Sequence, residues 1–176
     1  MDIFAHGLWS VAAYKAASRA PRQPKKLWLA ALFGTAPDLL AFLPLLLQTV
    51  IIHHSIRPDF VGEEGRLLAT AVPEYVYMLY NVSHSLVVFL AAFGLVWLIR
   101  KKPLWEMGAW GLHILIDIPT HTSEFFPTPF LWPLSSFKTS GIAWADLRFQ
   151  ILNYGALIVA FLFLCRKPKN PPSPVV

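Results

Sequence analysis

The sequence has few cysteines and few charged residues, and each shortage excludes a class of protein. Cys165 is the single cysteine among 176 residues, so the chain has neither an internal disulfide nor a cysteine-based zinc site. Only 14% of the residues are charged, whereas an ordinary soluble domain has about 25%. The chain begins Met1-Asp2-Ile3-Phe4 without a basic segment, which argues against a cleaved signal peptide.

Hydrophobic residues are abundant instead, at 56% of the chain. A soluble protein this short could not bury so much apolar surface in one core, so we favour an integral membrane protein over a soluble helical domain. The net charge of +5 comes from short basic clusters between apolar runs. Membrane topology explains such clusters better than a nucleic-acid surface does, and we expect no nucleic-acid partner.

Five apolar segments predict an all-α, polytopic helical membrane bundle. They cover residues 3–17, 27–52, 75–99, 104–118 and 147–165. A span needs about 20 residues, so the first and fourth segments are marginal. We expect Gly34, Pro37 and Pro44 to interrupt the second. One membrane-embedded domain over 1–167 and a disordered tail over 168–176 follow from this reading.

The basic residues predict the orientation. If all five segments cross, one side of the membrane holds ten cations: Arg19, Arg22, Lys25, Lys26, Arg100, Lys101, Lys102, Arg166, Lys167 and Lys169. The positive-inside rule then places the N-terminus outside and the C-terminus inside. We expect the protein in the cytoplasmic (inner) membrane of a bacterium, with membrane lipids around it and an oligomeric state that the sequence does not give.

The most informative stretch lies at the end of the fourth segment. His113, Asp117 and His121 are spaced four residues apart, which places them on one side of a helix. Ionisable groups at membrane depth are rare and point to function. A partner or a metal would explain the burial of His113 and Asp117. Pro119 precedes His121 and could spoil its alignment.

Three further residues lie at a similar depth in the membrane if all five segments cross it. His6 lies near the outer end of the first segment, Asp38 near the middle of the second, and His84 in the outer half of the third. Each also has a structural explanation: an interface histidine, a helix cap after Pro37, and a hydrogen bond between helices. Together the six residues predict a site for a divalent metal, with zinc first, manganese or iron also suited, and one or two ions bound.

The order of these motifs resembles that of the YdjM-like family of membrane-bound metal-dependent hydrolases. The matching elements are His6, Pro37-Asp38, Ser83-His84-Ser85, the His113-x-x-x-Asp117 helix and the segment from Phe130 to Pro133, within about residues 1–135. The His-x-x-x-Asp pairing is also similar, more distantly, to that of zinc-dependent phospholipase C. The resemblance implies a metal-dependent hydrolase, and by analogy a phospholipase-like one.

The sequence contains no Gly-x-Ser-x-Gly motif, phosphate-binding loop or His-Glu-x-x-His helix, so metal-activated water is the simplest hydrolytic mechanism. We expect Asp117 or Glu124 as the general base and a lipid or lipid-linked phosphoester as the substrate. Glu124 could also be a ligand or merely solvated. Two other classes stay open: a divalent-metal or proton transporter that uses the same residues, and a non-catalytic membrane scaffold whose histidines only stabilise packing.

Overall fold

The computed structural model describes residues 1–17, 24–53 and 72–165, and within these ranges the regular structure is entirely helical. This confirms the all-α prediction. The elements are α1 (Ile3–Ala17), α2 (Pro24–His53), α3 (Glu74–Ser83), α4 (Leu86–Arg100), the short 3-10 helix η2 (Trp105–Met107), α5 (Gly108–Thr120) and α6 (Leu147–Cys165). The predicted tail at 168–176 lies outside the described residues.

The second segment is one continuous helix, and the predicted interruption is wrong. Pro37 and Pro44 both lie inside α2, which runs for 30 residues. Asp38 is therefore an interior residue, and it does not cap a half-helix. Proline is tolerated inside such apolar helices because neighbouring helices and side chains satisfy the backbone groups that it leaves free.

The third segment, in contrast, is broken where a single helix was expected. α3 ends at Ser83, α4 begins at Leu86, and the two axes differ by 57°. Ser85 causes the new start, because its hydroxyl accepts hydrogen bonds from the backbone N–H groups of Val87 and Val88 at 3.1 and 3.2 Å. His84 lies in the break.

Fewer helices than expected can cross a membrane. α2 and α6 are long and apolar enough, and the bent pair α3–α4 would make a third span. This corrects the prediction of five. α1 and α5 have 15 and 13 residues, so they reach only about 20–22 Å, short of a hydrocarbon core of about 30 Å.

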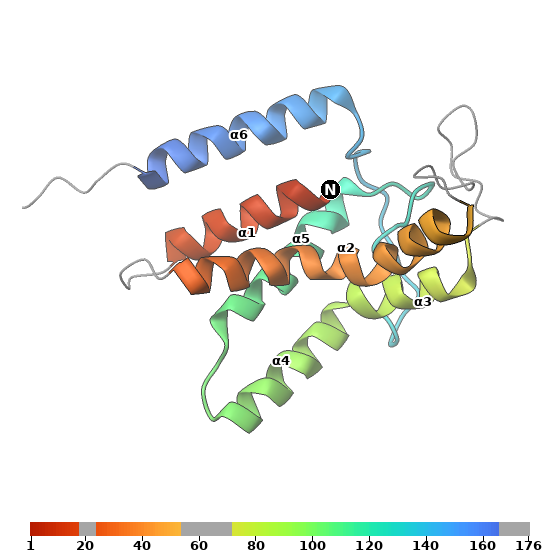
Figure 1. Cartoon of the computed structure of the whole chain (residues 1–176), viewed down its shortest axis with the longest axis horizontal. Helices are drawn as coiled ribbons and strands as arrows, with labels where there is room; N and C mark the ends of the chain where they lie inside the picture. The colour runs from red at the N-terminus through yellow and green to blue at the C-terminus, as the bar shows by residue number, and fades with distance from the viewer. Residues whose placement is uncertain (18–23, 54–71, 166–176) are drawn as a thin grey trace, which may run out of the picture.

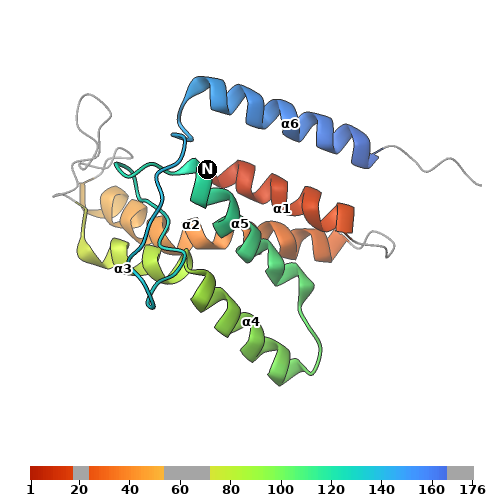
Figure 2. The same cartoon turned by 180° about the vertical axis from the view of Figure 1, so that it is seen from behind.

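The helices assemble so that α1 lies between α2 and α6, with α5 packed against α1 and α2 (Figures 1 and 2). The beginning of α2 and the ends of α4 and α6 lie toward the same end of the molecule (Figure 1). Lys25 and Lys26 lie at the beginning of α2, and Arg100 lies in the last turn of α4.

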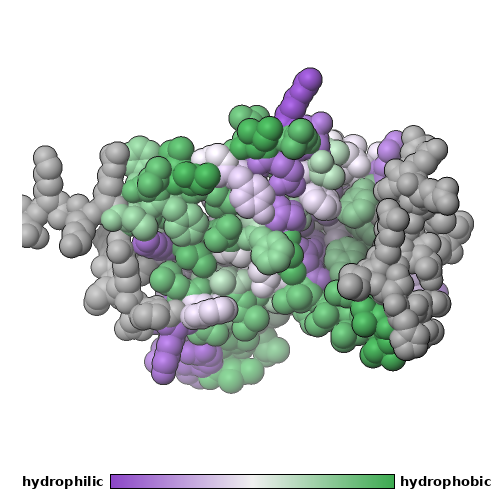
Figure 3. Space-filling model, turned by 45° about the horizontal axis from the view of Figure 1, so that its top comes forward, coloured by the Kyte–Doolittle hydropathy of each residue, from purple (hydrophilic) through white to green (hydrophobic). Residues whose placement is uncertain are grey.

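Much of the surface is apolar. Hydrophobic residues cover most of the face in Figure 3 that is not drawn in grey. Large apolar side chains on α6 are more than half exposed: Leu147, Ile151, Leu152, Ile158, Val159, Leu162 and Phe163. Exposed apolar surface of this extent suits contact with lipid.

Candidate metal centre

The structure brings together the six residues that the sequence nominated as metal ligands. They come from separate elements: His6 from α1, Asp38 from α2, His84 from the break before α4, His113 and Asp117 from α5, and His121 from the position directly after α5. All except Asp38 are buried, and the Asp38 side chain is 13% exposed. Asp38 is therefore the least buried member of the cluster.

Four of the six form a compact set suited to one cation: Asp38, His84, His113 and Asp117. His84 Nε2 and His113 Nε2 are 3.1 Å apart. Asp117 Oδ2 lies 3.5 and 3.2 Å from these two nitrogens, and Asp38 Oδ1 lies 3.4 and 3.8 Å from them. Ligand atoms around a tetrahedral zinc are roughly 3.3–3.6 Å apart, given bonds of about 2.0–2.2 Å. The observed spacing is close to this.

The contacts of Nδ1 in His113 and His84 determine that Nε2 of each ring faces the centre. His113 Nδ1 lies 2.7 Å from the carbonyl oxygen of Gly34. Because a carbonyl only accepts, Nδ1 carries the proton and Nε2 presents its lone pair. His84 Nδ1 lies 2.9 Å from Ser83 Oγ, which supports the same orientation. Metal-binding histidines in proteins are usually held in this way.

A second group of atoms surrounds the other oxygen of Asp117. His6 Nε2 lies 2.8 Å and His121 Nε2 3.4 Å from Asp117 Oδ1. The α-amino nitrogen of Met1 lies 2.5 Å from the same oxygen and 3.1 Å from His121 Nε2. His121 Nδ1 donates to the carbonyl oxygen of Phe126 at 2.9 Å, so its Nε2 also presents a lone pair.

Two side chains of the cluster, those of His6 and Asp117, contain buried polar atoms that have no hydrogen-bond partner. Both ring nitrogens of His6 and Oδ2 of Asp117 are buried without a hydrogen-bond partner in the described structure. His6 Nε2 is close enough to Asp117 Oδ1, but the direction is wrong for a hydrogen bond. Buried polar atoms are rarely left unpaired. The unpaired Oδ2 of Asp117, which faces His84 Nε2 and His113 Nε2, is therefore better explained by an ion than by hydrogen bonding among the side chains.

Close contact between α1 and α2 makes this convergence possible. A Cβ atom on Gly34 would lie 2.0 Å from Ser10 Oγ, so only glycine lets the two helices approach this far. The same approach places His6 beside Asp117, and the Gly34 carbonyl orients His113. Gly34 thus contributes to the centre in two ways, whereas the sequence suggested only a helix interruption.

Glu124 lies apart from the cluster. It is exposed in the loop after α5 and lines a pocket of about 160 Å³ together with Tyr77, Tyr80, Asn81 and Lys138. Among the described residues no hydrogen bond or ion pair joins Glu124 to the six. Its predicted role as general base stays a prediction.

Two contributors were missed from the sequence, the α-amino group of Met1 and the side chain of Tyr80. Tyr80 is four residues before His84, so the helical period could have indicated that they share a face. Nothing in the sequence pattern marks the amino group.

No protein-family model, curated protein or solved structure matches the chain. The resemblance to the YdjM-like family therefore stays a prediction from its motifs.

Proposed function

We propose that the cluster binds a divalent cation, zinc by preference and manganese as the next choice, and that the protein is a membrane-embedded metal-dependent hydrolase. The observation that carries this proposal is the spacing of Asp38, His84, His113 and Asp117. Imidazole nitrogen and carboxylate oxygen suit both metals. Membership of the YdjM-like family is part of the same proposal.

A second ion is proposed at the other oxygen of Asp117. Asp117 Oδ1 faces His6 Nε2 and His121 Nε2, and an ion here would take the place of the Met1 amino group, which lies against the same oxygen. Asp117 would then bridge two cation positions. Paired metal ions are common in enzymes that cleave phosphoesters, because they stabilise both the attacking and the leaving oxygen.

The reaction we propose is hydrolysis of a lipid or lipid-linked phosphoester. When bound, a divalent metal lowers the pKa of a water molecule enough for that water to act as a nucleophile toward phosphorus at neutral pH. Asp38, the one partly exposed member of the cluster, admits substrate and solvent from its side. Asp117 has both oxygens among ligands, so it serves better as a ligand than as a base. Glu124, in its open pocket, is the candidate base. The apolar surface supports a lipid substrate.

A transporter for divalent metal or protons is the main rival, and the packing weighs against it. A conducting path needs polar groups along its whole length. One turn along α1 after His6, however, α1 and α2 are in such close contact that even one methyl group on Gly34 would overlap Ser10. This leaves little room for a path between those helices. The scaffold alternative would leave unexplained why the buried atoms of His6 and Asp117 have no hydrogen-bond partners.

Metal analysis and a lipid assay test the proposal together. Wild-type protein purified in detergent should contain stoichiometric metal, and His113→Ala and Asp117→Asn should contain much less. Thr49→Val is the matched control, because Thr49 is also a buried polar residue but lies on α2, where its hydroxyl donates to the Leu45 carbonyl of its own helix. With zinc or manganese, the wild type should release water-soluble phosphoester from phospholipid vesicles.

Each competing class predicts a different result. Metal flux into proteoliposomes that Asp117→Asn abolishes, without lipid cleavage, would favour the transporter. A wild type that contains no metal and cleaves no lipid phosphoester under any divalent ion would refute the proposal. In that case, loss of stability alone in His113→Ala would identify the scaffold.

A further inference from the structure

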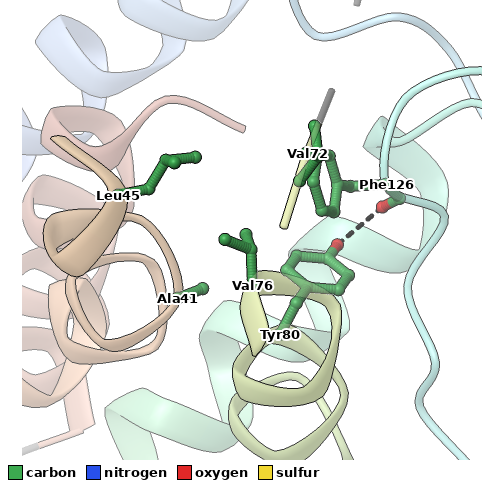
Figure 4. Close-up of a cluster of buried hydrophobic side chains, with 6 residues drawn as sticks. All are labelled: Ala41, Leu45, Val72, Val76, Tyr80 and Phe126. Atoms are coloured by element: carbon green, nitrogen blue, oxygen red, sulfur yellow. Dashed lines mark hydrogen bonds between the residues drawn. The ribbon is translucent and has the colours of Figure 1, made fainter. Parts of the chain in front are cut away.

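We propose that Tyr80 is a positioning residue of the metal centre, which holds His84 and His121 in the orientation that binds the cation. The inference rests on the proposed metal site. Tyr80 lies in α3 and is only 2% exposed. It belongs to a hydrophobic cluster that is formed by Ala41, Leu45, Val72, Val76, Tyr80 and Phe126 (Figure 4). It contacts one histidine through its ring and the other through its hydroxyl.

The hydroxyl acts on His121 through a shared carbonyl. Tyr80 Oη donates to the backbone oxygen of Phe126 at 2.6 Å, and His121 Nδ1 donates to the same oxygen at 2.9 Å. Tyr80 Oη is also 3.3 Å from His121 Nδ1. The position of one carbonyl therefore decides where the His121 ring points, and the Tyr80 hydroxyl fixes that carbonyl.

The backbone at Phe126 needs such support. Phe126 has a φ of 44°, in the left-handed region that a bulky residue rarely adopts. Its ring packs edge-on against Phe42 and lies parallel to Tyr77, with centroid distances of 5.1 Å in both cases. Ring packing holds the side chain, while the hydrogen bond from Tyr80 holds the carbonyl. Without the hydroxyl, the turn from His121 to Phe126 loses the contact that directs its carbonyl.

The ring acts on His84 by stacking. The Tyr80 and His84 rings have centroids 3.8 Å apart and planes inclined by 24°. Ser83 Oγ contacts the same imidazole at Nδ1. The stack sets the plane of the ring and Ser83 sets its rotation within that plane, so His84 Nε2 is directed at Asp38 and Asp117. His84 lies in a helix break, where backbone hydrogen bonding alone constrains it less.

Tyr80→Phe separates positioning from simple packing, because it keeps the ring and removes only the hydroxyl. Tyr75→Phe is the matched control: Tyr75 lies on the same helix and its hydroxyl donates to Gln48 at 2.6 Å, away from the centre. We would measure zinc affinity by competition with a chelator, and the visible absorption of the cobalt-substituted protein. Loss of an outer hydrogen-bond partner typically weakens metal binding by about 10- to 100-fold.

We expect Tyr80→Phe to weaken zinc binding by about 10-fold or more and to alter the cobalt spectrum, with Tyr75→Phe like the wild type in both. In a His121→Ala background, Tyr80→Phe should have little further effect on affinity, because the hydroxyl acts through His121. Equal effects in both backgrounds, or unchanged zinc affinity and cobalt spectrum, would overturn the inference. A wild type that binds neither metal would instead refute the proposed metal site itself.

Discussion

Gly34→Ala is a direct test of the packing that assembles the centre. The added methyl group would lie 2.0 Å from Ser10 Oγ and 2.6 Å from Ser10 Cβ, so α1 and α2 must move apart. Overpacking of this kind costs about 1–3 kcal/mol in the free energy of unfolding. The better helix propensity of alanine offsets up to about 1 kcal/mol of that cost. Because the Gly34 carbonyl orients His113, zinc affinity should fall as well.

The assay is equilibrium unfolding in mixed detergent micelles, followed by circular dichroism, with zinc affinity measured on the same samples. Gly94→Ala is the control, because nothing lies within 4 Å of a Cβ at Gly94 in α4. There we expect a gain of about 0.4–1 kcal/mol. Ser10→Gly added to Gly34→Ala removes both clashing atoms and should restore much of the stability. If Gly34→Ala is as stable as Gly94→Ala, the close approach of α1 and α2 is wrong.

Three further predictions use the same preparations. Trp9→Phe removes the 2.8 Å hydrogen bond from Trp9 Nε1 to Asn153 Oδ1, which joins α1 to α6. It should lower the free energy of unfolding by about 0.5–1.5 kcal/mol. An unchanged free energy would mean that this hydrogen bond does not hold α6 against α1. Zinc affinity should fall as the pH falls, because protons compete for the imidazoles, and a pH-independent affinity would exclude histidine ligands. Removal of metal by a chelator should lower the melting temperature, because a ligand at about 100 times its Kd stabilises the native state by about 2.7 kcal/mol. An unchanged melting temperature would contradict a bound ion.

Local features of the fold were predictable because they depend on short runs of sequence. α1 and α6 have the bounds expected for segments 3–17 and 147–165. In both cases polar or charged residues lie directly outside an apolar run. The break at His84 was missed because hydropathy averages over a window, whereas the break depends on one capping hydroxyl, that of Ser85. Segment length, by contrast, already indicated that the first and fourth segments were marginal as spans.

The site was predictable in part for the same reason. His113 and Asp117 share a helix face by spacing alone, and the structure places His113 Nε2 3.2 Å from Asp117 Oδ2. The approach of His6, Asp38 and His84 depends on how helices pack. The argument from membrane depth that suggested it assumed five spans, whereas the structure has two or three candidates. The backbone carbonyls of Gly34 and Phe126 could not be anticipated, because every residue has a carbonyl and only the tertiary fold decides which one meets an imidazole.

Lone pairs that face one another give the strongest reason to expect a cation in this cluster. Nε2 of His84 and Nε2 of His113 lie 3.1 Å apart, and His113 already donates Nδ1–H to the Gly34 carbonyl. Asp38 Oδ1 and Asp117 Oδ2, which only accept hydrogen bonds when ionised, lie 3.2 to 3.8 Å from the same two nitrogens. Buried carboxylates without a partner are costly away from water. One added proton on either nitrogen lies along the line to only one of these neighbours. A divalent ion, in contrast, is a common partner for both nitrogens and both carboxylates.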